Sequence, residues 1–215
     1  MSLSVEALDV DIGAASIIRG AHLALQSGTM CGLVGRNGAG KTSFMRSIMG
    51  FLPPRRGTIR FGDVDLAGLA PYERARRGIG YMPEDRRLVP DFTVDDNIFL
   101  PAWAMAKRDA ARRQAWITEL IPELAPLARR RASELSGGQQ KLAALARALM
   151  CGSSLLLLDE PTEGLAPSLA RRLGEILAKL RGTGLTVLIA ESNETHLGDL
   201  LDALFIIERG AIERR

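Results

Sequence analysis

A glycine-rich turn near the N-terminus carries the residue types that bind phosphate. Residues 35–42 read Gly-Arg-Asn-Gly-Ala-Gly-Lys-Thr, which fits the P-loop spacing G-x-x-x-x-G-K-[ST]. Glycines let successive backbone N–H groups point at phosphate oxygens. We expect Lys41 to reach the β- and γ-phosphates of a nucleotide and the Thr42 hydroxyl to ligate Mg²⁺. The residues predicted to contact the nucleotide here are Gly35, Arg36, Asn37, Gly38, Ala39, Gly40, Lys41, Thr42 and Ser43.

Two adjacent carboxylates follow the apolar run from Leu155 to Leu158. Such a run is typical of a fully buried parallel strand, and ligands of parallel sheets lie outside the carboxyl ends of the strands. We expect Asp159 to hold Mg²⁺ through water, because hard cations prefer oxygen ligands. Glu160 is suited to polarise or deprotonate the water that attacks a γ-phosphate. Together with the P-loop, this pair predicts an enzyme that hydrolyses a nucleoside triphosphate with Mg²⁺.

A third pattern that can bind an anion is Leu135-Ser136-Gly137-Gly138-Gln139. It stands at the start of a helical segment, where the Ser136 hydroxyl and the glycine N–H groups form an anion site. An ordinary serine cap of the helix is the competing interpretation. Because this helix follows an inserted segment, its start need not face the P-loop of the same chain.

The elements that position these groups follow from the hydrophobic periodicity. Strands are expected at residues 2–10, 17–25, 58–61, 77–83, 155–158, 185–190 and 203–207, and an apolar run leads into the P-loop. Helices are expected after residue 40 and at 102–120, 138–149 and 169–180. Strands that alternate with helices predict a parallel sheet covered on both faces. We interpret residues 1–215 as one domain, with a helical subdomain inserted at about residues 93–150.

The composition excludes several classes of protein. The chain has 215 residues, of which 47% are hydrophobic and 25% charged, as expected of a globular protein. We expect no signal peptide and no membrane span, since no apolar run is long enough. The two cysteines predict a reducing compartment. The net charge is only +3 and 5% of residues are aromatic, so no nucleic-acid partner is expected.

The stretch from Leu135 to Gln139 resembles the L-S-G-G-Q signature of ATP-binding cassette (ABC) ATPases, and the resemblance covers essentially the whole chain. It implies an α/β fold: a P-loop NTPase with a central mostly parallel sheet, a small antiparallel β subdomain and an inserted α-helical subdomain. It also implies a second cassette as partner, identical or related, whose P-loop holds the γ-phosphate over which this signature closes. Integral-membrane permease subunits would dock on the helical insertion and hold the protein on the cytoplasmic face of the cell membrane.

Two further stretches narrow the resemblance. Residues 160–167 are similar to the E-P-[ST]-x-G-L-A-P stretch of ATPases from branched-chain amino acid importers. Residues 81–87 resemble their Q-loop, with Glu84 at the usual glutamine position, where a carboxylate suits Mg²⁺ or the attacking water. Sugar importers carry a similar Glu-Asp-Arg run. The resemblance therefore implies an importer ATPase for branched-chain amino acids or a related small polar solute, with another solute as the alternative.

Two positions depart from the family pattern. Ile12 stands where an aromatic ring usually stacks on adenine, so apolar contact is expected without stacking. Ser192 stands at the place of the switch histidine, and His196, several residues on, is interpreted as a helix-surface residue. A serine hydroxyl cannot carry the charge of an imidazolium. A slow, sensor-like cassette that pairs with a more active ATPase is therefore a second hypothesis.

Overall fold

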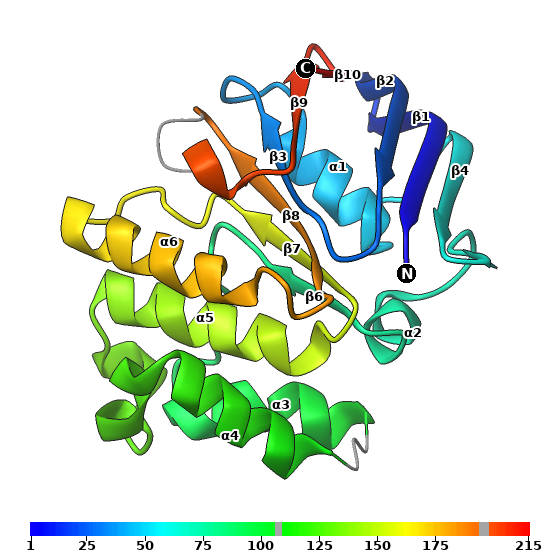
Figure 1. Ribbon diagram of the computed structural model, residues 1–215. Coiled ribbons are helices and arrows are strands. Elements are labelled where there is room, and N and C mark those ends of the chain that lie inside the picture. Colours follow the sequence, from blue (N-terminus) through cyan, green and yellow to red (C-terminus); the bar gives the residue numbers. More distant parts are fainter. Residues whose placement is uncertain (106–108, 194–197) are drawn as a thin grey trace.

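A six-stranded sheet of order β10-β9-β3-β8-β7-β6 forms the centre of the protein (Figure 1). The computed structural model describes residues 1–105, 109–193 and 198–215. All neighbouring strands of this sheet run parallel except β10 and β9. In sheet order, the strands are β10 (Ala211–Arg214), β9 (Ala203–Glu208), β3 (Met30–Val34), β8 (Thr186–Glu191), β7 (Leu155–Asp159) and β6 (Ile79–Met82).

A second, antiparallel sheet has the order β2-β1-β4-β5. Helix α1 (Lys41–Ile48) lies between the two sheets, and its apolar side chains share one core with both (Figure 1). The strands β2 and β4 alternate exposed and buried residues, because only one face of this sheet is covered. Its strands are β2 (Ala15–Leu25), β1 (Leu3–Ile12), β4 (Arg56–Phe61) and β5 (Val64–Asp65).

Helices cover the other face of the central sheet. Helix α5 (Gly137–Cys151) and α6 (Pro167–Leu180) lie next to it, while α3 (Val94–Met105) and α4 (Ala110–Leu120) pack beyond α5 (Figure 1). Their apolar residues form a second core, which accounts for the complete burial of β7 and β8 between the two cores. The short helices are α2 (Pro71–Arg76), η1 (Pro122–Leu127), η2 (Ala132–Glu134) and η3 (Gly198–Leu200).

The predicted fold class is confirmed, and one helix prediction is wrong. The segment 102–120 is not a single helix, since α3 already begins at Val94 and α4 begins at Ala110. The Thr93 hydroxyl accepts a hydrogen bond from the Asp96 N–H at 3.1 Å, which caps the start of α3. Pro101 lies inside α3 rather than at its first turn. Among the described residues, no helix is long and apolar enough to cross a membrane.

Candidate functional site

The P-loop connects the end of β3 to the first residue of α1. Gly40, the N-cap of α1, has a φ of 113°, a conformation that side chains resist. At Gly35 a Cβ would lie 2.3 Å from the carbonyl oxygen of Ile207, so only glycine fits. No side chain of the described residues caps the start of α1, and its first N–H groups can therefore serve an anion.

A cavity of about 400 Å³ opens beside the P-loop. Its volume is in the range of small-molecule sites. Most of the nucleotide-contact residues predicted from the P-loop line it, together with Glu84 and Glu160. Ile17 and Glu163 also line it and had no predicted role. The complete lining is Ile17, Asn37, Gly38, Gly40, Lys41, Thr42, Ser43, Glu84, Glu160 and Glu163.

Thr42 and Asp159 meet because α1 begins beside the carboxyl end of β7. The Thr42 hydroxyl donates a hydrogen bond to Asp159 Oδ1 at 3.2 Å, and the Tyr81 hydroxyl donates to Asp159 Oδ2 at 3.0 Å. Burial raises the pKa of Asp159, while these two hydrogen bonds oppose that rise. Sequence analysis assigned no role to Tyr81, although its strand is the parallel neighbour of β7.

The oxygen atoms of Thr42 and Asp159 fit Mg²⁺, which is commonly held by one or two protein groups and the phosphates of a substrate. Both residues and Glu84 line a smaller neighbouring cavity of about 240 Å³. In the described part of the chain, no three His, Cys, Asp or Glu side chains gather as a metal site. Water and phosphate oxygens are ligands that could complete the coordination of Mg²⁺.

Replacing Tyr81 with phenylalanine is expected to raise the Mg²⁺ concentration for half-maximal ATPase activity about 10-fold. The change removes the donor to Asp159 but keeps the ring that lies 6.2 Å from the ring of Phe51. The measurement is phosphate release against free Mg²⁺ at fixed ATP. Tyr72→Phe is the matched control, because that side chain is exposed. An unchanged Mg²⁺ dependence in Tyr81→Phe would exclude this role.

Glu160 lies at the centre of a hydrogen-bonded group. The Lys41 ammonium is 3.0 Å from Glu160 Oε1 and donates to the carbonyl oxygen of Gly35 at 2.6 Å. The Ser192 hydroxyl lies 2.9 Å from Glu160 Oε1 and 2.7 Å from Asn37 Oδ1, and its single proton serves one of them at a time. The structure thus brings Ser192 into the site. His196 lies outside the described residues.

Glu84 and Glu163 add negative charge to the same cavity. Partial burial raises the pKa of Glu84, and the neighbouring charge of Glu163 raises it further. Glu163 could have been found from its place three residues after Glu160. The negative charge of Glu84 would repel a bound phosphate unless Mg²⁺ or a proton offset that charge.

Gly35, Arg36 and Ala39 of the P-loop do not line this cavity, and neither do Ile12 and the signature residues, which come from other segments. The side chain of Ile12 is 46% exposed at the end of β1, and Ile17 lines the cavity instead. Ser136 is the N-cap of α5, where its hydroxyl accepts from the Gln139 N–H at 3.3 Å and the Gln139 side chain accepts from the Ser136 N–H. The signature residues therefore cap α5 and do not line the P-loop cavity of their own chain.

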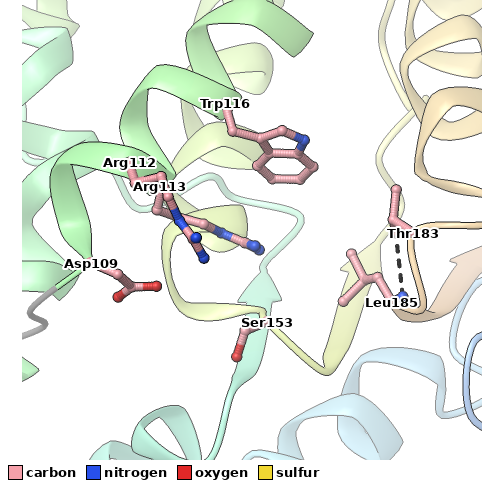
Figure 2. Close-up of a pocket in the computed structure, with 7 residues that line it drawn as sticks. All are labelled: Asp109, Arg112, Arg113, Trp116, Ser153, Thr183 and Leu185. Carbon is pink, nitrogen blue, oxygen red and sulfur yellow. Dashed lines mark hydrogen bonds between the residues drawn. The ribbon is translucent and has the colours of Figure 1, made fainter.

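Another cavity, of about 380 Å³, lies near the amino ends of β7 and β8 (Figure 2). The Arg113 guanidinium lies over the Trp116 ring and donates to the carbonyl oxygens of Leu149 and Gly152 at the end of α5. Arg113 thus joins α4 to α5. None of the residues predicted to bind nucleotide lines this cavity.

Comparisons with known proteins agree with the geometry. The family model described as ABC transporter matches residues 18–163. The chain is 33% identical to the high-affinity branched-chain amino acid transport ATP-binding protein BraG of Pseudomonas aeruginosa, over 98% of this chain and 90% of BraG. It is 32% identical to the lipopolysaccharide export system ATP-binding protein LptB of Escherichia coli K12, over 90% of this chain and 81% of LptB.

Solved structures show the same fold. The ADP conformation of an ATP-binding cassette of an ABC transporter superposes with a TM-score of 0.84 at 27% identity, covering 99% of this chain and 90% of that one. The dimeric structure of a bacterial ABC transporter cassette gives a TM-score of 0.86 at 21% identity, covering 99% and 97%.

Proposed function

Because the chain belongs to the ABC transporter family and is one of its ATPase cassettes, we propose that it energises an importer for branched-chain amino acids or a related small polar solute. The observation that carries the solute class is the similarity to BraG over 98% of this chain. Residues 164–167, Gly-Leu-Ala-Pro, support it. LptB, the ATP-binding protein of an export system, is 32% identical to this chain, so an exporter ATPase is the competing class of function.

The proposed chemistry uses the groups at the P-loop cavity. The N–H groups of the P-loop and the Lys41 ammonium bind the phosphates, while Thr42 and Asp159 hold Mg²⁺ beside them. Mg²⁺ supplies charge neutralisation for the transferred phosphoryl group. Glu160 accepts a proton from the attacking water, and Ser192 orients its carboxylate. The 2.9 Å distance between the Ser192 hydroxyl and Glu160 Oε1 supports that last role.

We place two partners on this cassette. A second cassette would present the γ-phosphate of its bound ATP to Ser136, Gly137 and Gly138 at the start of α5. The exposure of Ser136 and Gly137 supports this arrangement. A permease would dock on the helices around residues 93–150 and hold the protein at the cytoplasmic membrane face. ATP binding closes such a dimer and hydrolysis reopens it, which drives the conformational cycle of the permease.

Ser192 favours a second candidate, a slow cassette that depends on a more active partner. Its uncharged hydroxyl replaces a group that could carry a positive charge beside the γ-phosphate. Steady-state ATPase of the chain alone, compared with a mixture that contains its partner cassette, separates the two. A rate that rises only in the mixture supports the slow cassette.

The solute class is tested by deleting the coding sequence in its host and measuring uptake of radiolabelled leucine, isoleucine and valine. We expect uptake to fall and to return with the wild-type protein but not with Glu160→Gln. Glucose uptake is the internal control. Normal amino acid uptake together with lipopolysaccharide retained at the inner membrane would contradict the importer and favour export. Loss of glucose uptake alone would favour a sugar importer.

A further inference from the structure

Helix α5 contributes a buried positive charge that the proposed chemistry does not use. Lys141 stands two residues after Gln139, and only 6% of its surface is exposed. Its Nζ donates a hydrogen bond to the backbone carbonyl oxygen of Glu160 at 2.7 Å. Burial lowers the pKa of Lys141, and the nearby charges of Glu191 and Glu163 oppose that change. Burying an ammonium costs free energy, so we expect the contact between Lys141 and Glu160 to have a function.

The backbone that Lys141 contacts is strained. Glu160 has a φ of +47°, in the left-handed region that non-glycine residues rarely adopt. Its N–H donates to the carbonyl oxygen of Ala190 at 3.0 Å, and its own carbonyl accepts from Lys141 at 2.7 Å and from the Glu163 N–H at 3.3 Å. Both backbone groups of Glu160 are therefore held, the N–H by β8 and the carbonyl by α5 and the following turn.

A second buried side chain, that of Glu191, holds the turn after Glu160. Oε1 of Glu191, which is 5% exposed, accepts hydrogen bonds from the Thr162 N–H at 3.0 Å and from the Thr162 hydroxyl at 2.7 Å. The strained residue thus lies between an anchor from α5 and an anchor from the end of β8. Moving either anchor would turn the Glu160 side chain relative to the P-loop cavity.

We propose that Lys141 is a positioning residue that holds the Glu160 backbone so that the carboxylate faces the P-loop cavity. Lys141 stands in the second turn of α5, the helix that Ser136 caps. It therefore connects the general base of this chain to the site where the partner cassette's ATP docks. The inference rests on the proposed roles of Glu160 and of the signature residues.

Replacing Lys141 with methionine, whose unbranched side chain matches lysine as far as Cε but carries no ammonium, tests the inference. We expect kcat for ATP hydrolysis to fall about 10- to 100-fold, the loss typical of a misplaced catalytic group. The KM and the dissociation constant for ATP should change less than about two-fold, because Lys141 does not line the cavity. Lys179→Met on α6 is the matched control, since Lys179 is exposed. Unchanged kcat in Lys141→Met overturns the proposal.

A double-mutant cycle separates positioning from a general structural effect. Single-turnover hydrolysis is measured in Glu160→Gln with and without Lys141→Met. If Lys141 acts through the Glu160 carboxylate, the second change should alter the residual rate less than about two-fold. The same fold loss in both backgrounds would overturn the proposal. If the methionine variant melts below the assay temperature, Lys141→Gln is carried through the same cycle with the same criteria.

The outcomes also distinguish this inference from the function on which it rests. If Glu160→Gln keeps wild-type turnover, the proposed general base is wrong and the inference fails with it. If Glu160→Gln loses turnover while Lys141→Met keeps it, only the positioning role is wrong.

Discussion

Glu160→Gln is expected to lower the rate of ATP hydrolysis about 10²- to 10⁴-fold, the contribution of a positioned general base. Glutamine has the same shape but cannot accept the proton of the attacking water. ATP should bind at least as tightly, because the Lys41 ammonium now lies 3.0 Å from the carboxylate that the change neutralises. Phosphate release gives the rate, and titration with a fluorescent ATP analogue gives the affinity.

The matched control for this result is Glu163→Gln, which removes another carboxylate from the same cavity. We expect its turnover to fall less than about five-fold, because its carboxylate makes no ion pair with Lys41 in the described structure. Equal losses in the two variants would mean that net charge, and not a specific base, controls the rate.

Lys41→Met is expected to weaken ATP binding about 10²-fold. Charge-assisted hydrogen bonds contribute about 1.5–3 kcal/mol each, and roughly 1.4 kcal/mol corresponds to a factor of ten. The binding isotherm should be measured by calorimetry with and without Mg²⁺, since Lys41 acts on the phosphates directly. The affinity should therefore fall by a similar factor in both conditions.

Thermal unfolding of Lys41→Met must be measured as well, because the Lys41 side chain is buried and offsets the charge of Glu160. Lys179→Met again reports the effect of removing a lysine from the surface. A folded Lys41→Met protein with wild-type ATP affinity would exclude the phosphate contact.

Local sequence patterns predicted the parts of the site that are defined by one strand or one turn. The P-loop is such a part, because its spacing sets both the turn and the start of α1. The run that ends at Asp159 is another, since buried parallel strands end at a common edge. The pairing of Asp159 with Ala190 in neighbouring strands shows that edge.

Contacts between distant segments could not be predicted in the same way. Tyr81 contacts Asp159 across 78 positions, and nothing in the sequence near Tyr81 indicates that partner. Lys141 reads as an ordinary surface residue of an amphipathic helix until the fold places it under Glu160. Sequence analysis also selected Ile12, whereas the cavity is lined by Ile17. Which of the two lines it depends on how β2 passes the P-loop, and local sequence does not indicate that.

Helix α5 packs between the central sheet and the outer helices, and this position has a mechanical consequence. One side of α5 packs against the central sheet and the other against α3, within a single apolar core. Protein interiors are packed as densely as organic crystals and have little compressibility. A force applied to α3 is therefore transmitted through α5 to the strands, with little deformation of the core between them.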